Sequence, residues 1–281
     1  MRLATIRLPD GTRAVRIEAD HAVDLPFEDV GRLLREADWH TAALSAAGPR
    51  RALDDLDYAP LVPRPDKIVC VGLNYRKHIL EMGRELPGHP TLFAKYSPAL
   101  IGAYDDIELP AVSAAMDWEA ELGVVVGRTL RRADRAEAAS AIAGYTVVND
   151  VTARDWQYRT AQWLQGKTFE GTTPVGPWLT VAEDAKGALS APLACEVDGD
   201  LVQSADTADL VFDPAELLAY ISQIVTLLPG DLIATGTPGG VGHARKPPRY
   251  LTDGAVLVTR IDGLGECRNR CVAEKSPAGR P

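Results

Sequence analysis

The sequence of 281 residues lacks any uninterrupted apolar stretch of 18 residues, which a transmembrane helix would need. Its first residues, MRLATIRLPDGTRAVRIEAD, lack the apolar core of a signal peptide and alternate as a strand does. Basic residues are outnumbered, so the net charge is −9 and no basic nucleic-acid-binding surface is indicated. We therefore expect a cytoplasmic protein that binds neither membranes nor nucleic acids.

Cysteine is scarce as well. The four cysteines are Cys70, Cys195, Cys267 and Cys271, and without an export signal their thiols should stay reduced. Cys267 and Cys271 lie four residues apart, but no further pair or nearby histidine completes the four ligands of a structural zinc site. The sequence thus indicates neither a disulfide framework nor a zinc finger.

Three common catalytic signatures are also missing. No G-x-S-x-G occurs, so a hydrolase nucleophile elbow is not supported. The segment QGKTFEGTTPVGP (165–177) lacks the first glycine of a Walker A loop, because Ala161 stands at that position. The segment ATGTPGGVG (234–242) lacks the glycine spacing of a dinucleotide-binding turn, although its backbone N–H groups could hold an anion.

What the sequence does contain is typical of a globular protein, with 46% hydrophobic and 25% charged residues. Three prolines in APLVPRPDK (59–67) predict a boundary near residue 62, between a small N-terminal α+β domain (1–62) and a larger domain (63–281). Short strands dominate, which indicates a β-rich mixed α/β fold. Helices are expected at 51–58 and at 132–144, the latter with Asp134 as N-cap and Gly144 as its stop, and a hairpin is expected around Asp198-Gly199.

The most unusual stretch is DWEAELGVVV (117–126). Asp117, Glu119 and Glu121 alternate with apolar residues, so in one strand they would share a face. A solvated strand face explains such a row. However, the three valines that follow indicate burial, and buried carboxylates need a cation, for which Mg²⁺ bound through carboxylate oxygens is suited.

Other stretches offer partners for this row, each with a plainer explanation. Asp150 ends an apolar strand and is either a turn former or a third metal ligand, and Arg154 and Gln157 one turn later suit an acidic organic substrate. His78 and Glu81 are neighbours on a short helix that Gly83 ends. They are either an exposed pair or an oriented general base on a mobile lid.

Five stretches, in this order, resemble the fumarylacetoacetate hydrolase (FAH) family: VGLNYRKHILEMG, DWEAELGVVVGR, GYTVVNDVTARDWQ, GKTF followed by PVGP, and ATGTPGGVG. Together they span roughly residues 67–242. The resemblance implies an FAH-type β-roll catalytic domain over residues 63–281, a small N-terminal domain and a homodimer. It also implies Mg²⁺, with Mn²⁺ or Ca²⁺ as substitutes, held by Glu119, Glu121 and Asp150, while Asp117 supports the ligands without binding the metal.

The stretches look most like the acylpyruvase branch of the family. That resemblance implies catalytic roles for His78, Glu81 and Lys167, and substrate contacts for Arg154, Gln157 and Thr237. The reaction it implies is Mg²⁺-dependent hydrolysis of a C–C bond in a 2,4-diketo acid, such as fumarylpyruvate or acetylpyruvate, to pyruvate and a carboxylic acid.

Other functions stay open at this point. The same site could run decarboxylation or keto–enol tautomerisation of an oxaloacetate-like 2-oxo acid, or another family activity such as hydration or isomerisation. A non-catalytic, metal-stabilised binding protein is the alternative from a different class.

Overall fold

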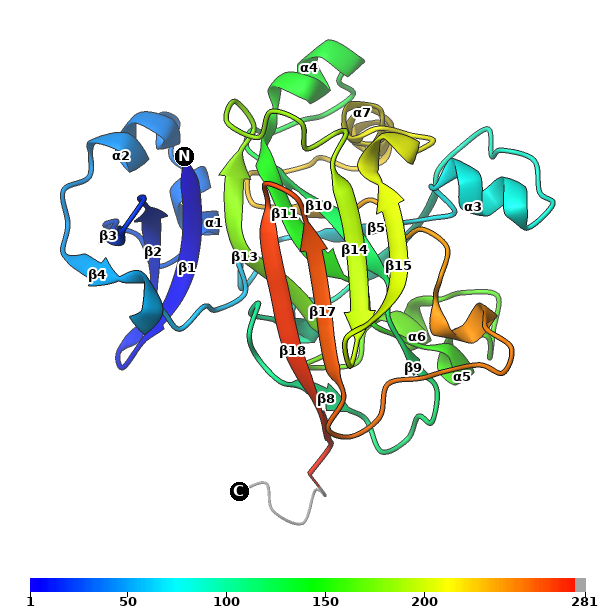
Figure 1. Cartoon of the computed structure of the whole chain (residues 1–281). Helices are drawn as coiled ribbons and strands as arrows, with labels where there is room; N and C mark the ends of the chain where they lie inside the picture. Colours follow the sequence, from blue (N-terminus) through cyan, green and yellow to red (C-terminus); the bar gives the residue numbers. More distant parts are fainter. Residues whose placement is uncertain (276–281) are drawn as a thin grey trace.

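A computed structural model describes residues 1–275, and strands account for most of its regular structure. One large sheet has the strand order β4 (Arg50–Ala52), β3 (His21–Asp24), β2 (Gly11–Ile17), β1 (Arg2–Leu8), β13 (Thr173–Val181), β11 (Ile142–Asn149), β10 (Ala120–Val126), β16 (Leu232–Ala234), β5 (Ile68–Gly72) and β6 (Thr91–Lys95). β7 (Leu100–Ile101) pairs with β13. A five-stranded sheet lies against its middle (Figure 1), in the order β15 (Asp200–Asp206), β14 (Pro192–Val197), β17 (Val256–Ile261), β18 (Gly265–Ala273) and β8 (Ile107–Leu109).

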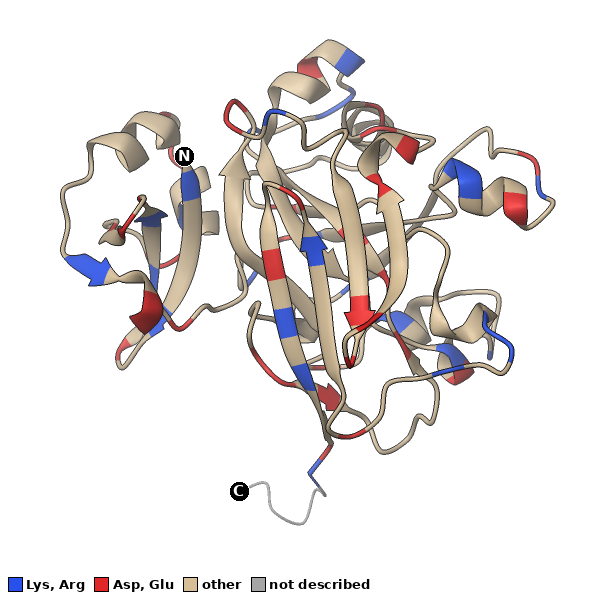
Figure 2. Cartoon of the chain, viewed as in Figure 1, with Lys and Arg blue, Asp and Glu red and all other residues tan. Residues whose placement is uncertain are grey.

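The helices are short and lie around the edges of the sheets (Figure 1). They are α1 (Val30–Leu34), α2 (Trp39–Ser45), α3 (Arg76–Glu81), α4 (Arg135–Ser140), α5 (Arg154–Gln157), α6 (Leu164–Lys167) and α7 (Pro214–Ile224). Four 3₁₀ turns are described, η1 (Leu53–Asp55), η2 (Ser97–Ala99), η3 (Thr207–Asp209) and η4 (Gly242–Ala244), and β9 (Met116–Asp117) pairs with β12 (Thr152–Ala153). Basic and acidic residues are interspersed over these elements (Figure 2).

The core explains the valines of β10. Val124 and Val126 belong to the cluster that fills the space between the two sheets, with Leu193 of β14 and Leu257 of β17. Val125 points to the opposite face and joins a second cluster that includes residues of the N-terminal segment. Because β10 is covered on both faces, all three valines are fully buried, which confirms the predicted buried strand.

The N-terminal strands continue the large sheet. β1 pairs antiparallel with β13, with Arg2 opposite Thr180 and Leu3 opposite Leu179. The second core cluster contains residues from both sides of this junction. The division of the chain near residue 62 stays a prediction about domain organisation, and the structure adds that the segment before it lies at one end of the sheet (Figure 1).

Several local predictions are confirmed. Asp198 and Gly199 both have positive φ, 55° and 84°, as a two-residue type I′ hairpin turn requires between β14 and β15. Asp134 caps α4 and accepts a hydrogen bond from the backbone N–H of Glu137.

One helix prediction is wrong, and another is wrong about where the helix ends. Residues 50–52 form β4, which pairs with β3, because the Arg51 guanidinium binds the Asp24 carboxylate at 2.6 and 2.8 Å and draws this segment onto the sheet. The helix expected over 132–144 ends at Ser140, and Gly144 lies inside β11. A Cβ on Gly144 would lie 2.1 Å from the carbonyl oxygen of Thr180, so this glycine permits close strand approach and does not stop a helix.

Asn74 is predicted to be a main support of the segment that leads into α3. This buried side chain donates hydrogen bonds to the carbonyls of Phe212 (3.0 Å) and Thr235 (2.8 Å) and accepts one from the N–H of Phe212 (2.8 Å). Asn74→Ala should lower the free energy of unfolding by about 2–4 kcal/mol, because three buried backbone groups lose their partner. Urea unfolding measures this, with the exposed Leu80→Ala as control; equal effects for both variants would contradict the assignment.

Candidate active site

The alternation of the acidic row predicts one continuous strand, but the row does not lie in one. β9 ends at Asp117 and β10 begins at Ala120, so Trp118 and Glu119 form an irregular step between them. Glu119 and Glu121 still line one pocket, whereas Asp117 is not among the pocket residues. The step therefore separates the three acids into a pair that faces the pocket and one acid that lies behind it.

Glu119, Glu121 and Asp150 come together at the ends of two paired strands. In the β10–β11 register Ala120 lies opposite Asn149, so Asp150 directly follows the paired segment. The Asp150 N–H donates to the carbonyl of Glu119 (2.8 Å), and the Glu119 N–H donates to the Asn149 side chain (2.9 Å). One oxygen from each of the three carboxylates lies within 4.8 Å of the others, and all three residues are buried.

Two buried lysines neutralise part of this charge. The Lys167 ammonium on α6 bridges Glu119 at 2.5 Å and Asp150 at 2.8 Å, and Lys95 of β6 binds the other oxygen of Asp150 at 2.6 Å. Burial opposes the charge on Lys167, but Asp150 and Glu119 outweigh it and raise the pKa of the ammonium. Burial likewise opposes ionisation of Asp150, yet Lys167 and Lys95 lower the pKa of this carboxyl to about 2. Lys167 is therefore a cation at neutral pH, not a base.

The guanidinium of Arg154, on α5, is likewise bound to neighbouring side chains. Its Nε donates to Asp117 (2.8 Å), its Nη2 lies 2.7 Å from Glu119, and its Nη1 donates to Gln157 (2.9 Å). Burial works against this charge, and Glu119 and Asp117 more than compensate, so the pKa of the guanidinium is raised. Asp117 also accepts backbone N–H groups of Trp118, Gly242 and His243 at 2.7–3.0 Å, which fits the predicted supporting role.

The negative charge of the Glu121 carboxylate is compensated much more weakly. Its carboxylate accepts one hydrogen bond, from the Gly236 N–H at 2.8 Å. Burial, and then the negative charges of Asp150 and Glu119, raise the pKa of Glu121 well above its ordinary value. In the cluster as a whole, four carboxylates (Asp117, Glu119, Glu121, Asp150) meet three cations (Lys95, Arg154, Lys167), so one negative charge is in excess when all are ionised.

This excess and the donor set fit a hard divalent cation. Magnesium-like ions prefer carboxylate oxygens, and the three pocket-side carboxylates supply them from two adjacent strand ends. A bound dication would change the cluster from one net negative charge to one net positive charge. The site could thus hold a divalent metal ion and present a positive charge to an acidic molecule.

Thr237 and Gln203 form a chain of hydrogen bonds beside the three carboxylates Glu119, Glu121 and Asp150. The Ala120 N–H donates to Gln203 Oε1 (2.9 Å), so the amide Nε2 faces Thr237 Oγ1 and donates to it at 2.8 Å. The Thr237 hydroxyl then donates to the Ala120 carbonyl (3.0 Å). Thr237 lines the pocket with its donor already used, so toward a ligand it can only accept a hydrogen bond.

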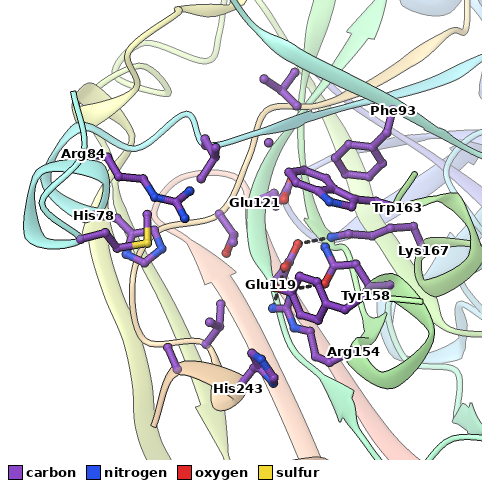
Figure 3. A pocket seen from close by; sticks show the side chains of 18 residues that line it. His78, Arg84, Phe93, Glu119, Glu121, Arg154, Tyr158, Trp163, Lys167 and His243 are labelled. Carbon is purple, nitrogen blue, oxygen red and sulfur yellow. Dashed lines mark hydrogen bonds and ion pairs between the residues drawn. The ribbon is translucent and has the colours of Figure 1, made fainter. Parts of the chain in front are cut away.

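The pocket has a volume of about 360 Å³ and lies between the cluster and α3 (Figure 3). His78 faces it from α3, opposite Glu119, Arg154 and Lys167. Burial lowers the pKa of the imidazole, more than the charges of Glu81 and Glu119 raise it. Glu81 does not line the pocket, and no hydrogen bond joins it to His78 within residues 1–275. The catalytic role of Glu81 stays a prediction. What the structure gives Glu81 is a negative charge beside the His78 ring.

Of the other residues predicted for the site, Arg154, Gln157, Lys167 and Thr237 all line this pocket. Sequence reasoning missed Lys95, Gln203, Arg84 and His243. Lys95 and Gln203 meet the cluster through contacts distant in the chain, and no local pattern marks them. His243 directly follows the Gly-rich segment and lines the pocket, and its Nδ1 lies 2.9 Å from the Tyr250 hydroxyl. The position of His243 beside the Gly-rich segment is the one sequence feature that could have indicated its place in the pocket.

The β-rich fold and this cluster together define a class of protein. Its members have an enzyme-type pocket with a buried group of carboxylates that can hold a divalent metal ion. The sequence profile described as Fumarylacetoacetate (FAA) hydrolase C-terminal matches residues 67–272. The chain belongs to the fumarylacetoacetate hydrolase family, as its motifs predict.

Three relatives illustrate the range of the family. The chain is 42% identical to "Oxaloacetate tautomerase Fahd2a, mitochondrial" of Rattus norvegicus over 231 residues, which cover 82% of this chain and 74% of the relative. It is 33% identical to the solved structure of fumarylacetoacetate hydrolase from psychrophilic Exiguobacterium antarcticum, with a TM-score of 0.86, covering 98% of this chain and 100% of the other. It is 30% identical, with a TM-score of 0.80 and the same coverage, to maleylpyruvate hydrolase from Sphingobium sp. SYK-6 in complex with manganese (II) ion and pyruvate.

These comparisons confirm the family and the fold and agree with a divalent metal, while the relatives' activities include tautomerisation as well as hydrolysis. Among the helices of residues 1–275, none is long and apolar enough to cross a membrane. The rat relative carries a mitochondrial designation, so the predicted cytoplasmic location stays a prediction.

Glu121→Gln should separate metal binding from folding. The amide can still accept the Gly236 N–H, and removing an excess buried charge should leave the metal-free free energy of unfolding within about 1 kcal/mol of wild type. Mg²⁺ at 100 times its Kd should stabilise wild type by about 2.7 kcal/mol and the variant hardly at all. Thermal unfolding with and without Mg²⁺ measures this. Glu81→Gln, which removes a charge outside the pocket, is the control, and equal Mg²⁺ stabilisation in both variants would disprove the role of Glu121.

Proposed function

We propose that this protein is a divalent-metal-dependent tautomerase that interconverts the keto and enol forms of an oxaloacetate-like 2-oxo acid, with Mg²⁺ as the resident ion and Mn²⁺ or Ca²⁺ as substitutes. The observation that carries the proposal is the neutral, half-buried imidazole of His78, which faces a cationic and carboxylate-rich wall across a small pocket. The similarity to an oxaloacetate tautomerase over 82% of the chain supports it.

The pocket suits a small anionic substrate. Its volume of about 360 Å³ is at the lower end of ligand sites and has room for a compact acid. Glu119, Glu121 and Asp150 would hold the metal, which, when bound, supplies a Lewis acid that stabilises negative charge developing on the 2-oxo group. Lys167 and Arg154 add fixed positive charge on the same wall, and both stay protonated.

The proton transfer falls to His78. In the keto-to-enol direction the imidazole takes a proton from C3, the C–H electron pair forms the C2=C3 bond, and the carbonyl pair moves onto the 2-oxo oxygen. A proton delivered to that oxygen gives the enol, and the reverse direction uses the same groups. Lys167 and Arg154 are excluded as bases because carboxylates hold their protons, and His78 is the imidazole on the wall that faces them.

Hydrolysis of a C–C bond in an acylpyruvate, which the motifs favour, is the second candidate. The solved maleylpyruvate hydrolase with manganese and pyruvate supports it. In that reaction His78 would deprotonate a water molecule, and pyruvate and a carboxylic acid would be released. Decarboxylation of oxaloacetate would also give pyruvate, but with CO₂. Tautomerisation releases no product fragment at all.

One panel separates the three reactions. Oxaloacetate, acetylpyruvate and fumarylpyruvate are each incubated with the Mg²⁺-loaded protein, with enol absorbance and ¹H NMR recorded together. The proposal expects rapid loss of the oxaloacetate enol signal without pyruvate above the uncatalysed rate. Pyruvate and a carboxylic acid from a diketo acid would instead support the hydrolase, and inertness toward all three would contradict both candidates.

His78→Gln should reduce kcat/KM for oxaloacetate tautomerisation by about 10²–10⁴-fold, the usual contribution of a general base, while Mg²⁺ still stabilises the fold. In wild type, burial lowers the pKa of His78, so the neutral base persists at neutral pH. The pH profile of kcat/KM should therefore fall in acid with a midpoint below 6.5, and the variant should lack this limb. An unchanged acid limb in His78→Gln would place the base elsewhere.

We further propose that the protein is a homodimer with a small-molecule substrate, as the family resemblance implies. Light scattering on the purified protein tests the assembly state, and a monomer at micromolar concentration would contradict it.

A further inference from the structure

The inner wall of the pocket offers no unpaired cation to a second anionic group. Lys95 and Lys167 hold Asp150 and Glu119, and Arg154 divides its donors among Asp117, Glu119 and Gln157. With a divalent ion bound, the four carboxylates and three cations of the cluster carry one net positive charge, which matches one substrate carboxylate. A dicarboxylate in this buried pocket would leave one negative charge uncompensated.

Arg84 is a pocket cation that forms no ion pair with the carboxylates of the inner wall. It follows α3, lines the pocket, and projects toward it from the same side as His78 (Figure 3). Within residues 1–275 no carboxylate lies within ion-pair distance of its guanidinium. The inner cations are thus paired, whereas Arg84 presents its charge to the pocket.

The backbone holds Arg84 in a defined place. Gly83 has φ +67°, and its N–H donates to the carbonyl of Leu80 (2.9 Å), while the Arg84 N–H donates to the carbonyl of Ile79 (3.2 Å). These two bonds form the Schellman motif, which ends a helix at a left-handed glycine and fixes the direction of the next residue. Arg84 therefore leaves α3 at a set position, beside the pocket and on the same element as the proposed base.

Other polar groups of this wall are less suited to bind an anion. His78 is neutral and is needed as the base. His243 lies 2.9 Å from the Tyr250 hydroxyl, which occupies one of its ring nitrogens. Glu81, also on α3, does not line the pocket.

We propose that Arg84 binds the second carboxylate, the one remote from the 2-oxo group, and so selects dicarboxylic over monocarboxylic 2-oxo acids. This inference rests on the proposed function, because it assumes that the 2-oxo acid end lies at the carboxylate cluster. Guanidinium groups bind carboxylates through two parallel hydrogen bonds, which gives orientation as well as affinity. Binding from α3 would also place C3 of the substrate between the cluster and His78.

Malate and lactate provide the test, because they are inert 2-hydroxy acids that differ by the second carboxylate. Titration calorimetry with Mg²⁺-loaded protein compares wild type with Arg84→Gln. Loss of a charged hydrogen-bond pair should weaken malate binding about 10- to 100-fold and leave lactate binding unchanged. Lys77→Gln, which removes an exposed positive charge from α3 away from the pocket, is the matched control and should affect neither ligand.

Turnover gives a second readout. Arg84→Gln should raise KM for oxaloacetate with little change in kcat. The same variant should leave phenylpyruvate tautomerisation unchanged. Arg84→Lys should restore part of the loss seen with oxaloacetate. Equal weakening of malate and lactate, or unchanged malate binding, in Arg84→Gln would overturn the role of Arg84 alone. Wild-type protein that binds neither acid in the presence of Mg²⁺ would overturn the proposed function, and this inference with it.

Discussion

The ammonium group of Lys167 is the contact on which the site depends. It bridges Glu119 and Asp150, which come from the ends of two adjacent strands and would otherwise repel each other in a buried environment. Lys95 secures the remaining oxygen of Asp150, and Arg154 secures that of Glu119. These cations allow Glu119, Glu121 and Asp150 to stay buried within 4.8 Å of one another. Because Arg154 also binds Asp117, three cations face four carboxylates, and one negative charge is left when all are ionised. The remaining negative charge is what makes a divalent ion the natural complement.

The fold serves this charge arrangement directly. The β10–β11 register brings Glu119 and Asp150 together, and buried valines on both faces of β10 keep the strand from shifting. The Gly236 N–H and the chain of hydrogen bonds through Gln203 hold Glu121 and Thr237 at the pocket. On the opposite wall, α3 carries His78 and ends in the turn that places Arg84. On our proposals, one wall stabilises charge, while the other transfers a proton and selects the substrate.

Much of this arrangement could be predicted from the sequence, because local patterns report local physics. Asp-Gly turns, Asp caps and an unbroken valine run depend on neighbours in the chain, and those predictions are confirmed. The ordered motifs indicated the family, and Glu119, Glu121, Asp150, Lys167 and Arg154 do lie together. Lys95 and Gln203 could not be found this way, because they meet the cluster only after strands distant in sequence have paired. Similarly, the alternation of the acidic row could not reveal the irregular step at Trp118 that sets Asp117 apart.

If a divalent cation completes the carboxylate group, a crystal grown with Mn²⁺ and measured at the manganese absorption edge should reveal it. We expect a single strong anomalous peak in contact with oxygens of Glu119, Glu121 and Asp150, with the ammonium groups of Lys95 and Lys167 still bound to Asp150. An absence of anomalous density there at saturating Mn²⁺, or a peak only at surface carboxylates, would contradict it.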